Sequence, residues 1–114
     1  MSEGRKDDLG KTRYDLMSPI ALEGYGRILT YGSKKYNDRN WESGIKFGRV
    51  FAAIMRHLWK FWMGEDIDSE SGEPHLSSAM WGCATLLHYT QHPTRDYREF
   101  DDRPDKEAVC LIIQ

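Results

Sequence analysis

The chain has 114 residues, of which 39% are hydrophobic and 12% aromatic, and its formal net charge is −2. This length predicts one small domain whose core gains from burial between subunits, so we expect a homo-oligomer. The slightly acidic charge argues against binding to a nucleic-acid polymer. With two single cysteines, no signal-peptide core and no apolar run of membrane-spanning length, the sequence predicts a cytosolic protein without disulfides.

Residues 1–17 are expected to form a polar N-terminal arm, because they follow neither a helical nor a strand period. A frayed terminus is the alternative. Tyr14, Leu16 and Met17 favour an ordered arm that packs near the first helix. In an ordered arm, Lys11 and Arg13 are candidate phosphate ligands, because both keep their positive charge at neutral pH.

Three helices are predicted in residues 18–91, the nucleotide-binding domain of this interpretation. The first covers about 18–31 and opens on an N-cap serine followed by proline. The second covers 49–63 and the third about 75–90, and apolar residues recur along both with helical spacing. We take these stripes as core. The predicted fold is all-α, a small bundle of three main helices completed by oligomerisation.

The segment 33–41, after the first helix, combines three cations with two aromatic side chains. Cations can hold phosphate oxygens while Tyr36 or Trp41 stacks on a base, so this segment favours nucleotide binding. The structural alternative is a set of ordinary cations at a helix C-terminus beside a tryptophan that anchors the loop. The candidate substrate-binding residues here are Lys34, Lys35, Tyr36, Arg39, Asn40 and Trp41.

An acidic loop, defined here as residues 64–75, contains five carboxylates and one histidine between two apolar segments. Oxygen ligands in such numbers suit a hard divalent cation such as Mg²⁺ or Mn²⁺. A short loop makes the flanking helices antiparallel neighbours, which would gather Glu65, Asp68 and His75 at the end of the pair, with His57 one to two turns below. These four residues are the candidate metal ligands. A solvated loop and a structural His57 are the alternatives.

The C-terminal residues 92–114 are interpreted as a charged linker without fixed structure, followed by an apolar arm at 109–113. Such an apolar run is not expected to stay exposed. It is either a terminal strand or an arm that packs on a second subunit.

Four blocks of sequence together resemble a known family. They are GKTRYDL at 10–16, YGSKKY at 31–36 with RNW at 39–41, RHL at 56–58, and GEDID at 64–68 with SG at 71–72 and HL at 75–76. In this order they are similar to the phage-encoded MazG-like dATP/dGTP diphosphohydrolases. The best-known MazG-like enzymes hold their metals with a Glu-x-x-Glu pair on one helix and a Glu-x-x-Asp pair on the next. Neither pair occurs on the predicted helices.

The resemblance implies an all-α enzyme that uses a divalent metal, Mg²⁺ or Mn²⁺, to hydrolyse a purine deoxynucleoside triphosphate to the monophosphate and pyrophosphate. In this reading Glu65 serves as ligand and base, Asp66 is its substitute, and Arg56 adds a contact to the substrate. One alternative is a phage protein that binds and sequesters a nucleotide without turnover. Another is a subunit of a larger assembly in which the acidic loop is only solvated.

Overall fold

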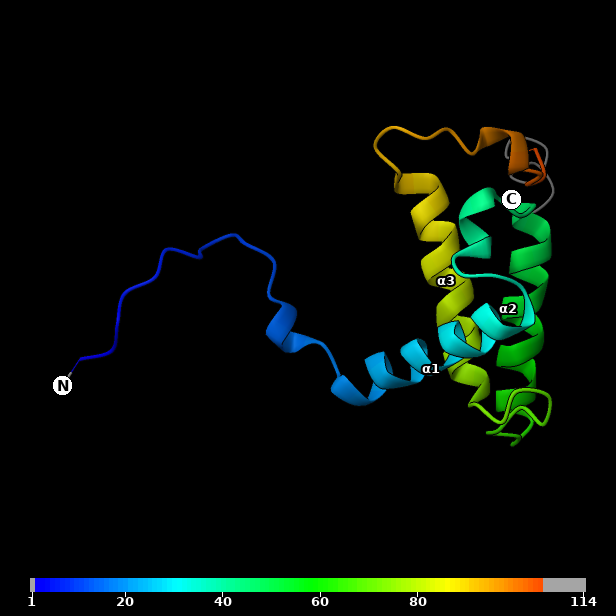
Figure 1. Cartoon of the computed structure of the whole chain (residues 1–114), viewed down its shortest axis with the longest axis horizontal. Coiled ribbons are helices and arrows are strands. Elements are labelled where there is room, and N and C mark those ends of the chain that lie inside the picture. The colour runs from blue at the N-terminus through cyan, green and yellow to red at the C-terminus, as the bar shows by residue number, and fades with distance from the viewer. Residues whose placement is uncertain (1, 106–114) are drawn as a thin grey trace, which may run out of the picture.

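The computed structural model describes residues 2–105, which form three α-helices joined by loops (Figure 1). Helix α1 spans Pro19–Lys35, α2 spans Phe47–Trp62 and α3 spans His75–Gln91. No β-strand occurs in this part of the chain, so the predicted all-α class is confirmed. The apolar arm expected at 109–113 lies outside the described residues. Three short 3₁₀ helices complete the structure, at Tyr14–Leu16, Asn40–Ser43 and Arg98–Phe100.

Helix α1 begins as its sequence predicts but ends one turn later. The hydroxyl of Ser18 accepts a hydrogen bond from the amide of Ala21 at 3.1 Å, which satisfies one of the free N–H groups of the first turn. Gly32, the expected C-cap, keeps a negative φ and stays inside the helix. The helix instead stops at Tyr36, whose amide donates to the carbonyl of Gly32 at 2.9 Å. The lysines of the predicted loop therefore belong to the last turn of α1.

Helices α2 and α3 lie antiparallel and side by side, as expected for the two arms of a helical hairpin (Figure 1). Their close approach depends on Gly82, because a Cβ atom at this position would lie 2.3 Å from Cγ1 of Ile54. On the other side of α3, a Cβ atom at Gly24 of α1 would lie 2.7 Å from the hydroxyl of Ser77. Helix α3 is therefore packed between α1 and α2, and small residues allow the close approach on both sides. The small residues of α3 thus contact helices of the same chain.

The buried core is narrower than the apolar stripe of α2. Val50 and Ile54 are buried with Ala79 and Tyr89 of α3. The prediction that the whole stripe is core is wrong within this chain, because α3 covers only part of it. The large apolar residues of α2 that stay exposed are Phe51, Met55, Leu58, Trp59, Phe61 and Trp62. On α3 the predicted stripe is likewise partly exposed, at Leu76, Cys83 and Leu87, while Ser77, Ser78 and Thr85 are buried.

The segment 92–105 is folded onto the helices, which corrects the expectation that it lacks fixed structure. Tyr97 is only 2% exposed, and its hydroxyl donates to the carbonyl of Glu42 at 2.8 Å. Phe100 packs against the core, and Asp102 accepts a hydrogen bond from the amide of Gly48 at 2.7 Å. Two aromatic side chains and one carboxylate thus contribute to holding this polar segment on the helices.

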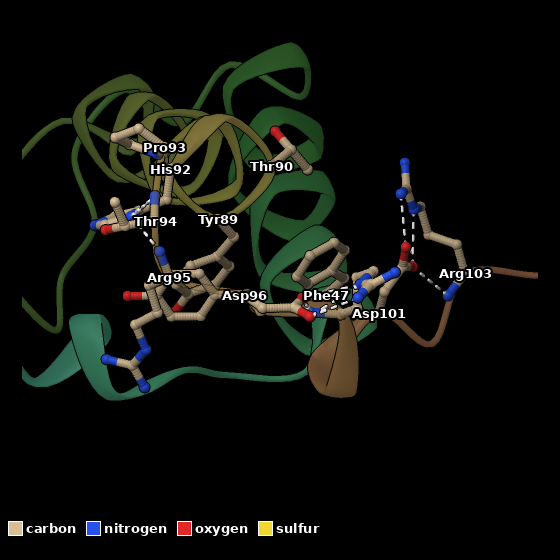
Figure 2. A pocket seen from close by; sticks show the side chains of 12 residues that line it. Phe47, Tyr89, Thr90, His92, Pro93, Thr94, Arg95, Asp96, Asp101 and Arg103 are labelled. Carbon is tan, nitrogen blue, oxygen red and sulfur yellow. Dashed lines mark hydrogen bonds and ion pairs between the residues drawn. The ribbon is translucent and has the colours of Figure 1, made fainter.

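The same segment forms one side of an open surface cavity of about 480 Å³ (Figure 2). The arginines around this cavity are engaged within the chain. Arg98 pairs with Asp96 at 2.8 Å and Arg103 with Asp101 at 2.6 Å. Arg95 donates to backbone carbonyl groups of the preceding loop. These interactions indicate a structural role for the charges.

The N-terminal arm runs away from the helices (Figure 1). Residues 2–13 contain no helix, and Tyr14, Leu16 and Met17 are exposed, so the expectation that they pack near the first helix is wrong. Among the described helices, none is both long and apolar enough to cross a membrane.

Candidate functional site

The acidic loop is folded by its own backbone hydrogen bonds. The amide of Asp68 donates to the carbonyl of Glu73 at 2.9 Å, and the amide of Gly72 donates to the carbonyl of Asp68 at 2.7 Å. Gly72 has φ +76°, a conformation that favours glycine. The amide of His75 donates to the carbonyl of Asp66 at 2.9 Å, which joins the loop to the start of α3. This folding turns Asp68 inward, toward α2.

His57 of α2, Asp68 of the loop and His75 of α3 form a cluster of potential metal ligands. One ligand atom from each lies within 4.8 Å of the other two. The Nδ1 atoms of the two histidines are 2.9 Å apart, and Nδ1 of His57 is 4.0 Å from Oδ2 of Asp68. His75 is only 4% exposed. The three residues come from three different elements, and only the hairpin geometry brings them together.

Glu65 contacts His75 through the other ring nitrogen. Its Oε2 atom lies 2.7 Å from Nε2 of His75, whereas Nδ1 of the same ring faces His57. The carboxylate therefore sits behind His75 with respect to the cluster. The side chain of Asp66 is exposed and belongs neither to the cluster nor to the cavity lining described below.

Burial lowers the pKa of His57, and the Asp68 carboxylate opposes part of this shift. His57 is therefore neutral at pH 7 and has a free lone pair on one ring nitrogen, as a metal ligand requires. Two imidazoles and one carboxylate form a donor set that fits a divalent cation.

A cavity of about 710 Å³ opens beside this cluster and has the size of a small-molecule site. His57 and Asp68 contribute to its wall together with Lys35, Arg39 and Arg49. The cavity therefore places three cations beside two of the potential metal ligands, and three carboxylates, Asp38, Asp68 and Glu70, line the same wall. Its remaining lining comes from α1, the loop after it, the acidic loop and α3, and consists of Ile28, Leu29, Thr30, Tyr31, Gly32, Ser33, Tyr36, Asn37, Asp38, Asn40, Trp41, Ile45, Glu70, Ser71, Ser78 and Trp81.

Two of the cations of this cavity, Lys35 and Arg39, are held by neighbouring carboxylates. Lys35 donates to Glu70 at 2.6 Å, and this bond raises the pKa of the Lys35 ammonium. Arg39 is paired with Glu42, and its guanidinium lies 5.7 Å from the ring centre of Trp41. These contacts stabilise both side chains at the rim of the cavity without neutralising them.

The predicted site residues divide into two groups. Those that line the cavity are Lys35, Tyr36, Arg39, Asn40, Trp41, His57 and Asp68. Those that lie outside its lining are Lys11, Arg13, Lys34, Arg56, Glu65, Asp66 and His75, of which His75 belongs to the metal cluster. Arg13 is paired with Asp15 at 2.7 Å, and Arg56 is exposed on α2.

Sequence reasoning missed Arg49, Ser78 and Trp81 as cavity residues. Helical spacing contained a signal for two of them. Arg49 lies eight residues before His57, and Ser78 lies three residues after His75, so each shares a helix face with a candidate metal ligand.

The described residues thus define a small all-α protein with a cavity lined by cations and carboxylates and a histidine–carboxylate cluster at its wall. Residues 1–103 match the family described as dATP/dGTP diphosphohydrolase, N-terminal, and the chain belongs to this family. A protein of Salmonella phage PMBT28 named dATP/dGTP diphosphohydrolase is 33% identical over 98 residues. The match covers 85% of this chain and 33% of that relative, so the chain spans about a third of the relative's length. The comparison with solved structures gave no significant match.

These findings confirm the resemblance to the phage dATP/dGTP diphosphohydrolases. The more specific MazG-like relationship stays a prediction.

Proposed function

We propose that the chain binds a purine deoxynucleoside triphosphate, dATP or dGTP, and hydrolyses it to the monophosphate and pyrophosphate with the help of Mg²⁺ or Mn²⁺. The name of the phage relative supports this class of reaction. The observation that carries the proposal is the shared cavity wall of His57, Asp68, Lys35 and Arg39. Phosphoryl chemistry needs cations around the phosphates and a metal site within reach, and this cavity has residues suited to both.

The cations would bind the substrate through its phosphates. Lys35, Arg39 and Arg49 carry N–H donors at the cavity wall, and charge-assisted hydrogen bonds to phosphate oxygens would hold the triphosphate chain. Trp41 and Tyr36 line the same cavity and offer aromatic faces on which a purine can stack. Recognition would thus combine charge at one end of the ligand with stacking at the other.

The cluster of His57, Asp68 and His75 would hold the divalent cation. In this role the three residues would hold a cation that would supply positive charge to the triphosphate and polarisation of the α-phosphorus. The Asp68 carboxylate, placed at the wall, would orient the attacking water and accept its proton. The oxygen of this water bonds to the α-phosphorus, the bond from this phosphorus to the bridging oxygen breaks, and pyrophosphate leaves. We assign this role to Asp68 because Glu65, expected to fill it, contacts His75 instead.

The proposal is tested by incubating the chain with each (d)NTP and Mg²⁺ or Mn²⁺ and measuring pyrophosphate. We expect release from dATP and dGTP, and loss of release in Asp68→Asn. The matched control is Asp66→Asn, which removes a carboxylate from the same loop but outside the cavity and the cluster. Equal turnover by Asp68→Asn and the wild type would contradict the assignment. Tight binding without product would favour a sequestering protein, and no nucleotide binding would favour a subunit of a larger assembly.

We also propose that the chain forms a homo-oligomer through the exposed apolar face of α2. Trp59 and Trp62 are 62% and 78% exposed, and Phe51 and Met55 lie on the same helix with about half their surface exposed. An apolar patch of this kind is typical of an interface, and closed two-fold symmetry is the commonest way to bury it. A nucleotide substrate would place this assembly in the cytoplasm.

A further inference from the structure

We infer that the cluster of His57, Asp68 and His75 is a site for a first-row transition metal, such as Mn²⁺, Co²⁺ or Zn²⁺, that binds these ions in preference to Mg²⁺. In this site Glu65 is a positioning residue for His75 and not a ligand. The inference deepens the proposed function. It rests on that proposal in one respect, namely that a divalent cation binds at this cluster.

The tautomer of His75 is fixed by Glu65. A carboxylate can only accept, so Nε2 of His75 donates to Oε2 of Glu65 across the 2.7 Å contact. The neutral imidazole that metal binding requires has a single N–H, so in this form Nδ1 of His75 carries a free lone pair. This lone pair faces Nδ1 of His57 at 2.9 Å. When no metal is bound, one of the two rings donates a hydrogen across this contact.

A cation can replace that proton. If His57 carries its hydrogen on Nε2, the two Nδ1 lone pairs face one another, and rotation of the rings would turn both toward one ion. Two ligands at about 2.1 Å from one ion and at right angles to each other are about 3 Å apart, and the two Nδ1 atoms are 2.9 Å apart. Oδ2 of Asp68, 4.0 Å from Nδ1 of His57, supplies the third donor atom.

The donor set decides which ion is preferred. Mg²⁺ takes oxygen ligands almost exclusively and keeps several waters, whereas imidazole nitrogen suits the first-row transition ions. Two of the three donors in this cluster are imidazole nitrogens. His75, at 4% exposure, is also shielded from the water that Mg²⁺ would retain. The acidic composition of the loop, which suggested a hard cation, is misleading because most of its carboxylates lie outside the cluster.

The arrangement around His75 matches the carboxylate–histidine–metal triads in which an outer carboxylate orients the ligand and raises its basicity. Glu65 is half exposed, so removing its side chain leaves the buried packing intact. Loss of such an outer partner typically weakens metal binding by about 10- to 100-fold.

The test measures metal binding by the full chain in the absence of nucleotide, so the result does not depend on whether the chain hydrolyses a substrate. We expect Co²⁺ to give ligand-field absorption bands with the wild type, and Mg²⁺ in large excess to leave these bands unchanged. His57→Ala and Asp68→Asn should lose the bands. Glu65→Ala should weaken Co²⁺ binding by about 10- to 100-fold, with partial recovery in Glu65→Gln, which keeps an acceptor for His75. Asp66→Asn is the matched control, and its affinity should equal that of the wild type.

Three results would overturn the inference: no Co²⁺ binding by the folded wild type, displacement of Co²⁺ by Mg²⁺ at comparable concentrations, or wild-type affinity in Glu65→Ala. Loss of binding in Glu65→Ala as complete as in His57→Ala, with no recovery in Glu65→Gln, would make Glu65 a ligand and overturn its positioning role. Circular dichroism of each variant checks the fold. Metal binding without pyrophosphate release would contradict only the proposed function, and release supported by Mg²⁺ without Co²⁺ binding would contradict only this inference.

Discussion

The phenol of Tyr89 donates a hydrogen bond of 2.6 Å to the backbone carbonyl of Trp41. Tyr89 belongs to the buried core on α3, whereas Trp41 lines the cavity. This bond therefore connects the buried core with the loop that we expect to contact the purine. Preorganised loops of this kind lose less freedom when a ligand binds.

Replacing Tyr89 with phenylalanine should lower stability and weaken nucleotide binding. The carbonyl of Trp41 would lose its partner in a partly buried setting, which costs about 1–2 kcal/mol. Urea unfolding followed by circular dichroism measures the first effect, and titration with dGTP measures the second. Tyr14→Phe, at a site with 71% exposure, is the control and should change neither. Wild-type stability in Tyr89→Phe would show that the hydrogen bond contributes nothing net.

Alkaline pH should unfold the protein partly through the same side chain. Burial raises the pKa of Tyr89 to about 12, from an ordinary value near 10. Because the folded-state pKa is the higher one, the contribution is fully present below pH 10 and is lost as the pH rises toward 12. The shift corresponds to about 2–3 kcal/mol. Melting temperatures at pH 9 and pH 11 should therefore fall more steeply for the wild type than for Tyr89→Phe, and parallel curves would contradict this.

Gly82→Ala should destabilise the hairpin, because its new Cβ atom would lie 2.3 Å from Cγ1 of Ile54 and force α2 and α3 apart. Overpacking of this kind costs about 1–3 kcal/mol, partly offset by the higher helix propensity of alanine. Gly26→Ala is the matched control in α1, where the new atom meets nothing within 4 Å. This control should stabilise the protein by about 0.5–1 kcal/mol. The melting temperatures of both variants, measured by thermal unfolding, test this prediction. Equal changes in melting temperature would refute the argument that α2 and α3 are closely packed at Gly82.

Variants of the adjacent residues Lys34 and Lys35 compare the effect of a cation outside the cavity with that of a cation that lines it. Lys35 lines the cavity, whereas Lys34 is exposed outside its lining. We expect Lys35→Ala to weaken binding of a nucleoside triphosphate by about tenfold, and binding of the monophosphate by less, because fewer phosphate oxygens contact the cation. Lys34→Ala should bind like the wild type. Fluorescence titration of tryptophan provides the measurement, and equal losses in both variants would indicate a general effect of net charge.

The oligomer proposal predicts a species larger than the monomer in multi-angle light scattering at micromolar concentration. Trp59→Glu combined with Trp62→Glu should convert it to a monomer, because two charges would be buried in the apolar interface. Neither side chain belongs to the buried core, so the helices themselves should persist in circular dichroism. A stable monomer for the wild type would contradict the proposal.

Local sequence patterns determined much of this structure. Ser18 and Pro19 fix the start of α1 through hydrogen bonding and φ restriction within one turn. Helical periodicity predicted α2 and α3 to within two residues at each end, and the short loop between them predicted their antiparallel pairing. From that pairing, Glu65, Asp68 and His75 were expected to meet, with His57 one to two turns below. The structure instead brings His57 into the cluster and leaves Glu65 on the far side of His75.

Tertiary structure decided what these local rules leave open. The periodicity of α2 predicts an apolar face but not its partner, so the exposure of Trp59 and Trp62 depends on how much of that face α3 covers. Tyr97 lies in a charged, aperiodic segment, yet it is buried because a distant loop offers its hydroxyl an acceptor. Glu65 and Asp68 look alike in sequence, but the turn between them directs one behind His75 and the other into the cluster. The backbone hydrogen bonds within the loop set these side-chain directions, and the packing of α2 against α3 places His57 opposite Asp68.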